Sequence, residues 1–296
     1  MKTYRILLLI PVFFGLNFSQ AQVIDAPTKA PVNRAWEKIH TPNRKRPVPY
    51  PSVREADIIW AKRVWRFLDL REKMNLPLYY PKRPVRDRKS LASVLMDAVS
   101  IPQPDRPFGT NYLTAYKDED FTERLTTMDE VKKRLVFEYT DDSLDASTGM
   151  TATVSKYYDI KPEDIIKYAI VEDWFFDKRR SQLDVRIVAI CPIYYKFSMS
   201  DGVQQFTDAP SELFWIYFPE ARYYLVNQEA YNPRNDAERR TYDELFIKRR
   251  FASYIYKVEN DYDRTIADYA TGLDALLESE RVKNEIFEFE QGLWEF

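Results

Sequence analysis

Apolar residues recur at helical spacing just after the proline-rich start of the chain. Ser52 and Glu55 have the spacing of a capping box, which satisfies backbone N–H groups at the start of a helix. The apolar positions that follow recur every three or four residues: Ile58, Ala61, Trp65 and Leu68. This periodicity predicts an amphipathic helix in which about half of the circumference is buried.

The same spacing predicts a second helix beginning near Pro162, a residue suited to a first helical turn. Its apolar positions are Ile165, Ile166, Ala169, Ile170 and Trp174. Further helices are expected at 89–99, from Thr127, from Thr241 toward Tyr256, and along the tail from Ile266 to Leu293. Short apolar runs predict strands at 135–139, 185–197 and 213–218, and the prolines around 78–80 predict a short extended piece.

Short matching stretches suggest two related halves. The order Asp-Ile-Ile at 57–59 recurs at 164–166, Ala-Tyr at 115–116 recurs at 230–231, and Thr-x-Asp-Glu at 127–130 recurs at 241–244. Chance recurrence of common helix starts explains these matches equally well. The expected fold class is α+β: two possibly related lobes of helices packed on short strands, an extended proline-rich N-terminal arm and a helical C-terminal tail.

The N-terminus has the pattern of a secretory signal peptide. Lys2 and Arg5 precede an apolar stretch from Ile6 to Phe18 that is short for a membrane span, and residues 19–21 give a small-x-small cleavage pattern. The expected organisation is a signal peptide at 1–21, a basic proline-rich arm at 22–51, a first lobe at 52–158, a second lobe at 159–260 and an acidic helical tail at 261–296.

Charge is strongly segregated although the whole chain is almost neutral, at −2. Residues 29–89 hold 17 basic and 6 acidic side chains, whereas residues 258–296 hold 3 basic and 11 acidic ones. The basic stretch has three interpretations: a solvated face, a surface that docks on an acidic protein, or a contact with lipid headgroups. A basic front and an acidic tail on one chain suggest head-to-tail association, which closes into a ring when the rotation permits.

Composition argues against several kinds of chemistry. The 6 glycines are scattered, so they cannot form a phosphate-binding loop, and 1 histidine cannot supply a two-histidine metal site. The 1 cysteine, Cys191, lies in an apolar run and is expected to be buried. Carboxylate clusters lie beside Lys or Arg or in polar loops. The sequence therefore predicts no enzyme, no cofactor and no metal.

Residues that dominate protein contacts, Trp, Tyr and Arg, concentrate in two blocks at 60–66 and 174–180. Core packing is the competing explanation for these aromatics. Together with the charged arm and tail, they give the candidate partner contacts: Trp36, Arg44, Lys45, Arg46, Trp60, Trp65, Arg66, Trp174, Arg179, Arg180, Glu285, Glu288 and Trp294.

Ordered motifs over nearly all of the mature chain resemble the gliding-motility family GldN, called PorN in relatives that do not glide. The blocks that carry the resemblance are Asn33-Arg34-Ala35-Trp36, residues 65–73 (WRFLDLREK), residues 172–178 (EDWFFDK), residues 215–219 (WIYFP), residues 232–237 (NPRNDA), Asp263-Arg264-x-Ile266-x-x-Tyr269, and Leu273-x-Ala275-Leu276-x-Glu278.

The resemblance implies a non-enzymatic structural subunit of the type IX secretion system of Bacteroidetes. It implies a periplasmic ring built with an outer-membrane lipoprotein of the GldK or PorK type, and contacts with the inner-membrane motor proteins GldL and GldM. Because an exported protein does not meet nucleic acid, no nucleic acid partner is expected. Two alternatives stay open at this point: a periplasmic glycan-binding or hydrolytic protein, and a chaperone-like factor that binds exported clients transiently.

Overall fold

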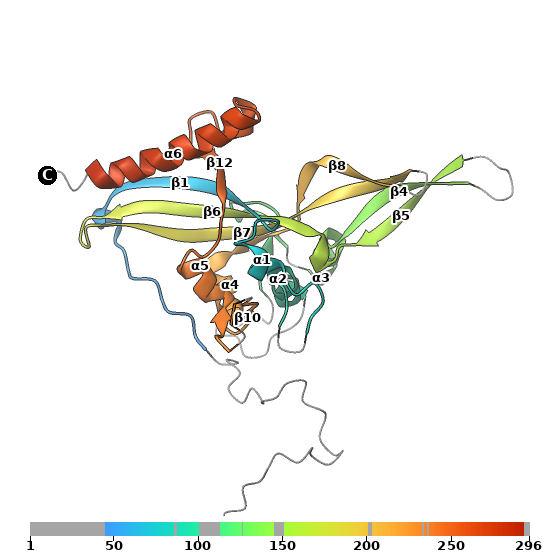
Figure 1. Ribbon diagram of the computed structural model, residues 1–296, viewed down its shortest axis with the longest axis horizontal. Helices are drawn as coiled ribbons and strands as arrows, with labels where there is room; N and C mark the ends of the chain where they lie inside the picture. The colour runs from blue at the N-terminus through green and yellow to red at the C-terminus, as the bar shows by residue number, and fades with distance from the viewer. Residues whose placement is uncertain are drawn as a thin grey trace, which may run out of the picture. The chain divides into compact units, whose positions relative to one another are not determined.

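Antiparallel strands dominate the computed structural model, which describes residues 45–85, 88–100, 113–125, 127–144, 151–200, 203–232, 234–235 and 237–292. The strands that belong to the main sheet are β1 (Ile58–Asp69), β2 (Ala115–Tyr116), β3 (Arg124–Leu125), β4 (Val136–Leu144), β5 (Thr151–Asp159), β6 (Ile165–Asp177), β7 (Gln182–Ser200), β8 (Val203–Glu212), β9 (Trp215–Tyr217) and β12 (Tyr254–Val258). Their central order is β12-β1-β6-β7-β9-β2-β3 (Figure 1). In addition, β5 pairs with β4, and β8 pairs with β7.

The expected fold of helices on short strands is wrong. The segments that were expected to form the first helix of each lobe are instead the long strands β1 and β6, which pair with each other from Ile58–Asp177 to Asp69–Lys167. The two segments are therefore neighbours in one sheet rather than helices of separate lobes. The signal peptide and most of the arm lie outside the described residues, so their boundaries stay predictions.

Burial on both faces explains why β1 and β6 lacked the alternating pattern of a strand. In β6, Tyr168 and Ile170 point into the main hydrophobic core, while Ala169 and Val171 point into a second core on the other face, and all four are buried. Strands buried on both faces are almost continuously apolar, so their sequence fits a helical template as easily as an extended one.

Six α-helices are present among the described residues: α1 (Leu76–Tyr79), α2 (Leu91–Ser100), α3 (Met128–Arg134), α4 (Phe218–Leu225), α5 (Tyr242–Ile247) and α6 (Leu273–Gly292). Three 3-10 turns, η1 (Glu55–Asp57), η2 (Pro162–Asp164) and η3 (Ile266–Asp268), and a small ribbon of β10 (Glu229–Ala230) with β11 (Arg240–Thr241) complete the elements. The helices predicted at 89–99 and from Thr127 are confirmed. The tail helix begins at Leu273 rather than at Ile266, where only the 3-10 turn η3 forms. The helix from Thr241 is shorter than expected, since β12 occupies residues up to Val258.

The matching stretches fall on matching local elements. Each Asp-Ile-Ile marks the passage from a 3-10 turn into a long strand, η1 into β1 and η2 into β6. Each Thr-x-Asp-Glu starts a helix whose threonine hydroxyl accepts the N–H of the glutamate three residues on: Thr127 in α3 and Thr241 in α5. These caps are local signals, which is why the sequence located both helix starts.

A buried side-chain amide joins the end of β1 to the segment that precedes β12. Asn75 is fully buried, and its Nδ2 donates to the carbonyl oxygens of Asp69 at 2.7 Å and Ala252 at 2.8 Å. Its Oδ1 accepts the N–H of Ala252 at 2.9 Å. The end of β1 is thereby tied through Asn75 to the residues just before β12, and Asn75 and Ala252 are 177 positions apart in sequence. All the principal hydrogen-bonding groups of this side chain are used.

The turn after β1 predicts a pH-dependent contribution to stability. The Arg71 guanidinium hydrogen-bonds the carboxyl of Asp69, at 2.7 Å for the shortest contact, and holds the pKa of that carboxyl below its usual value. A depressed pKa stabilises the fold at pH values above the unfolded pKa of about 4. Because Arg71 is exposed, Asp69→Asn is expected to cost about 1 kcal/mol at neutral pH.

This difference between Asp69→Asn and the unchanged protein should shrink as the pH falls through the folded-state pKa, because the protonated Asp69 loses the same interaction. Urea unfolding at several pH values measures it. Glu72→Gln, at an exposed carboxylate in the same turn, is the control and should change little. A cost that does not vary with pH would contradict the assignment.

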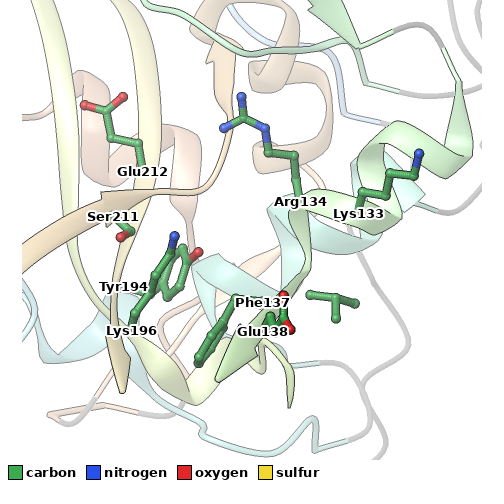
Figure 2. A pocket seen from close by; sticks show the side chains of 9 residues that line it. Lys133, Arg134, Phe137, Glu138, Tyr194, Lys196, Ser211 and Glu212 are labelled. Carbon is green, nitrogen blue, oxygen red and sulfur yellow. The ribbon is translucent and has the colours of Figure 1, made fainter. Parts of the chain in front are cut away.

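An open pocket lies between α3, β4, β7 and β8 (Figure 2). The strands β4 and β7 run parallel and are joined by the single bridge Asp141–Met199. The volume of the pocket is about 530 Å³. The residues around it come from α3, β4, β7 and β8: Lys133, Arg134, Val136, Phe137, Glu138, Tyr194, Lys196, Ser211 and Glu212.

Candidate interaction surface

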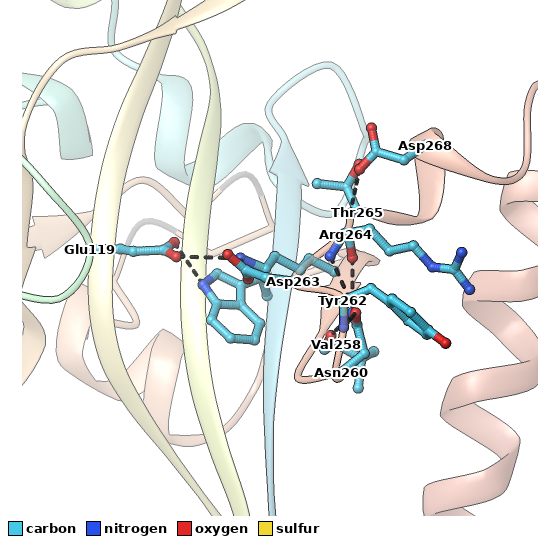
Figure 3. Close-up of polar contacts among 10 residues, drawn as sticks. Glu119, Val258, Asn260, Tyr262, Asp263, Arg264, Thr265 and Asp268 are labelled. Atoms are coloured by element: carbon cyan, nitrogen blue, oxygen red, sulfur yellow. Dashed lines mark hydrogen bonds and ion pairs between the residues drawn. The ribbon is translucent and has the colours of Figure 1, made fainter.

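The loop between β12 and η3 is held in one conformation by Asn260 (Figure 3). Its Nδ2 donates to the carbonyl oxygens of Val258 at 2.7 Å and Arg264 at 2.9 Å. Its Oδ1 accepts the backbone N–H groups of Tyr262 at 3.1 Å and Arg264 at 3.2 Å. One side chain therefore satisfies four backbone groups, as Asn does in tight turns, and the loop presents its remaining side chains in a fixed arrangement.

A charged network attaches this loop to the sheet (Figure 3). Lys257 forms ion pairs with Asp263 at 2.6 Å and with Glu119 at 3.6 Å, and its ammonium lies 4.7 Å from the centroid of the Trp65 ring. The Trp65 indole Nε1 donates to Glu119 at 2.7 Å. Burial raises the pKa of the Glu119 carboxyl, although Lys257 and Trp65 act in the opposite direction. Sheet, loop and the segment before β3 are thus connected through one carboxylate.

Two tyrosines and an arginine are exposed on this loop and just after the η3 turn that follows it. Tyr262 is 77% exposed and Tyr269 is 46% exposed. The guanidinium of Arg264 lies 4.9 Å from the Tyr262 ring centroid and 4.7 Å from that of Tyr269. Tyr269 also donates its hydroxyl to Glu278 of α6 at 3.3 Å. Tyrosine and arginine held rigidly at a surface are the residue types that carry most binding energy in protein interfaces.

The helix α6 extends this surface with an exposed apolar stripe. Its inner side is buried through Ser279, Val282 and Ile286, and the Ser279 hydroxyl accepts the N–H of Ile255 at 2.9 Å. The opposite side carries large apolar residues that are more than half exposed: Leu273, Leu276, Leu277 and Phe287. An amphipathic helix on a sheet normally shows water a polar outer side. A second apolar stripe on that side marks a contact surface.

The charge of α6 adds a third property to this surface. Between Leu273 and Gly292 the helix has six acidic and two basic residues, so it is net negative. Part of this charge is paired within the chain, because Glu285 forms an ion pair with Lys62 of β1 at 3.1 Å. Beside this pair, Phe289 stacks on Trp60 with ring centroids 4.5 Å apart. The C-terminal surface, defined here as Tyr262, Arg264, Tyr269 and the exposed side of α6, is therefore aromatic, apolar and acidic.

Residues 45–51, the last part of the proline-rich arm, are held against the fold by a second cluster of contacts. The backbone of Lys45 exchanges hydrogen bonds with the Asn227 side chain at 2.9 and 3.3 Å, and the carbonyl of Val48 accepts from Arg222 at 2.7 Å. The Tyr50 ring lies 4.4 Å from the guanidinium of Arg222 and 5.3 Å from that of Arg186. This arginine clamp, made by Arg186 and Arg222, holds residues 45–51 against the chain's own fold.

The clamp depends on a buried ion pair. Arg222 in α4 and Asp243 in α5 are both buried and are joined by two hydrogen bonds, at 2.7 and 3.3 Å. Such a bidentate contact orients the guanidinium, whose Nη2 also donates to the carbonyl oxygen of Val48. No sequence pattern pointed to this site, because its partners lie far apart along the chain and no local spacing connects them: Tyr50, Arg186, Arg222 and Asp243.

The aromatic candidates from the sequence are largely occupied within the chain. Trp65 is buried against Lys257, as described above. Trp60 stacks on Phe289 of α6. The Trp174 ring centroid lies 5.3 Å from the guanidinium of Arg249, and its indole N–H donates to the buried Glu172 at 3.0 Å. Arg66 lies in the same cluster and donates to Ser253 at 2.9 Å. Their assignment to partner contacts stays a prediction.

The charged candidates lie mostly at the surface. Lys45, Arg46, Arg179, Glu285 and Glu288 are exposed. Arg180 is paired with Asp177 and Asp184, at 2.7 and 2.8 Å. Trp36, Arg44 and Trp294 lie outside the described residues. The structure does not gather the candidates into one patch: Glu285 and Glu288 lie on α6, whereas the other charged candidates lie elsewhere in the chain.

The described part of the chain bears on catalytic, metal-binding and membrane-spanning roles. No group of three or more His, Cys, Asp or Glu side chains in it could hold a metal ion. Cys191 is fully buried, and burial raises the pKa of its thiol well above the ordinary value. None of the described helices has the length and hydropathy to cross a membrane.

Fold and surface together define a mainly β protein with a candidate contact surface for other proteins. A comparison with protein families supplies the particular family: the description "Gliding motility associated protein GldN" matches residues 53–295, so the chain belongs to the GldN family. This confirms the resemblance seen in the sequence motifs. The family is a structural component of gliding motility and is not a known enzyme family. Among curated proteins the comparison found no match.

Proposed function

We propose that this chain is a structural subunit of a periplasmic ring in the type IX secretion and gliding machinery, and that it binds an outer-membrane lipoprotein of the GldK or PorK type. Family membership supports the gliding assignment, and the signal-peptide pattern at 1–21 supports export. GldL- and GldM-type motor proteins are further proposed partners, which would link the ring to the inner membrane.

The C-terminal surface is the single observation that carries the proposal. Four large apolar side chains on one side of α6 are exposed by 54 to 70%, beside a rigid cluster of two tyrosines and one arginine. Exposing such a stripe to water is unfavourable by about 25 cal/mol per Å² of apolar area. A subunit that is covered by neighbours in an assembly avoids this cost, whereas a protein acting alone does not.

The test replaces Leu277 and Phe287 with Asp in the mature chain, produced with and without its lipoprotein partner. Both side chains are exposed, so the fold should survive, as checked by thermal unfolding. Light scattering and electron microscopy are expected to show large rings for the unchanged protein with its partner and a loss of most assembled material, about tenfold or more, for the variant.

The matched control is Met74→Asp with Ile247→Asp, which removes two exposed apolar side chains outside α6 and adds the same charge. It should assemble normally. Monomers of the unchanged protein under both conditions would overturn the ring proposal itself. Normal assembly of the α6 variant would support the ring proposal but show that the C-terminal surface is not the contact between its subunits.

A further inference from the structure

The exposed side of α6 carries carboxylates that are not paired within the chain. Asp274 and Glu288 are exposed and form no ion pair with any residue in the described ranges, whereas three other acidic side chains of this helix are paired with cations of the same chain. The two residues directly follow Leu273 and Phe287 of the apolar stripe. Their spacing of 14 residues, about four helical turns, places both along one flank of that stripe. A ligand of the C-terminal surface is therefore expected to be apolar and positively charged.

Residues 29–44 of the arm have the complementary composition. They hold four basic side chains and one acidic one. Apolar Val32, Trp36 and Ile39 recur among them at intervals of four and three residues, with Arg34 and Lys38 between these positions. The segment lies outside the described residues, and its sequence alone carries the match. In both hydrophobicity and charge it suits an apolar stripe that is flanked by carboxylates.

The arginine clamp separates the start of this segment from the α6 of its own chain. Residues 45–51 are held by Arg222 of α4 and by Asn227, whereas α6 packs on β1 and β12. In Figure 1 the first described residues, drawn in blue, end below β6 and β7, while α6 lies above β1. The arm of a neighbouring copy can approach α6 without passing these strands. A second copy is therefore the occupant that the fold favours.

We propose that the C-terminal surface of one copy binds residues 29–44 of a neighbouring copy. Trp36 and Ile39 pack on the apolar stripe, and Arg34 and Lys38 lie beside the unpaired carboxylates of α6. Such a contact is heterologous, because the arm of one copy meets the helix of the next, and repeated contacts of this kind close into a ring when the rotation permits. The inference rests on the proposed function and names the contact between its subunits.

Sedimentation velocity on the mature chain without its lipoprotein partner tests the apolar part of the contact. The unchanged protein is expected to self-associate in a concentration-dependent manner. Trp36→Asp with Ile39→Asp should weaken self-association by about tenfold or more. The matched control is Val23→Asp with Ile24→Asp, which adds the same charge to the arm outside residues 29–44 and should change it by less than about twofold.

Charge exchange tests the ionic part of the contact. Arg34→Glu with Lys38→Glu places negative charges opposite the carboxylates and should weaken self-association by about tenfold. Adding Asp274→Lys with Glu288→Lys to the same chain restores opposite charges across the contact and should return the affinity to within about threefold of the unchanged protein. A failure of this second pair to restore any affinity would overturn the proposed placement of Arg34 and Lys38.

Mixing two variants distinguishes a neighbouring arm from the chain's own arm. The arm variant (Trp36→Asp with Ile39→Asp) and the α6 variant (Leu277→Asp with Phe287→Asp) should each be monomeric. Their mixture should form one-to-one pairs, because one copy supplies an intact α6 and the other an intact arm. A mixture that stays monomeric, or an unchanged protein that does not self-associate, would overturn the proposal. Thermal unfolding of each variant verifies that the fold is kept.

Electron microscopy with the lipoprotein partner separates failure of this contact from failure of the proposed function. Normal rings from the arm variant would reject the arm contact and keep the ring. Absence of rings from the unchanged protein, together with one-to-one pairs in the mixture, would reject the ring and keep the arm contact. Loss of rings in both the arm variant and the α6 variant is the expected result.

Discussion

Asp243→Asn is expected to lower the free energy of unfolding by about 3–5 kcal/mol. The change is nearly isosteric, but it leaves the buried guanidinium of Arg222 without its counter-charge, and both side chains are at most 5% exposed. Taking a charge out of water is tolerated only when a partner and further hydrogen bonds compensate for it. Urea unfolding followed by fluorescence measures the loss.

Glu238→Gln is the matched control, because Glu238 forms a 2.7 Å ion pair with Arg240 whose side chains are 28 and 47% exposed. Breaking an exposed pair is expected to cost much less than breaking the buried one, because water and salt screen it. A similar loss in the free energy of unfolding for both variants would show that the Arg222–Asp243 pair stabilises the fold no more than an exposed pair does. Replacing both partners, as in Arg222→Met with Asp243→Leu, should recover part of the loss, since no unpaired charge remains.

Asn75→Asp is expected to destabilise the protein by about 3 kcal/mol or more at neutral pH. The substitution replaces the Nδ2 donor by an oxygen, so the carbonyl groups of Asp69 and Ala252 both lose their donor and face a negative charge. Because Asn75 is fully buried, water cannot replace these bonds. Part of the stability should return at low pH, where a protonated carboxyl can donate one hydrogen bond.

Asn260→Asp makes the same chemical change at an exposed residue that also donates to two carbonyl oxygens, those of Val258 and Arg264. Water can reach these groups, so we expect a cost of about 1 kcal/mol or less. Urea unfolding of the two variants at neutral and acidic pH compares the sites. Equal costs would mean that the buried amide does not hold the end of β1 to the start of β12.

The local helix-start signals at Thr127 and Thr241 were read correctly, whereas the one at Ser52 precedes only a 3-10 turn that leads into β1. Signals that depend on distant partners were not read correctly. The threonine caps at Thr127 and Thr241 satisfy backbone groups within one turn, so the helix starts could be found from a few residues. The long strands could not, because β1 is buried partly by α6 and β6 on both faces by other elements. Their apolar positions then fill a helical template by coincidence.

The candidate surface was predictable only in part. Segregated charge drew attention to the tail, and α6 is indeed an acidic helix. The exposed residues of the C-terminal surface are mostly leucine, phenylalanine and tyrosine side chains, however, whereas most tryptophans chosen from composition pack inside the fold. Exposure depends on which side of a helix faces the sheet, and the 3.6 periodicity alone gives two apolar stripes without saying which is buried.

The short pairing of β12 has a consequence for how the molecule opens. On one side β1 pairs with β6 along nearly its whole length, whereas on the other it pairs with β12 only from Val64–Val258 to Phe67–Tyr254. The unit formed by β12 and α6 can therefore unfold locally with less loss of backbone pairing than the central strands. A partner that binds the C-terminal surface binds only the closed form, so assembly and the local order of this unit are thermodynamically linked.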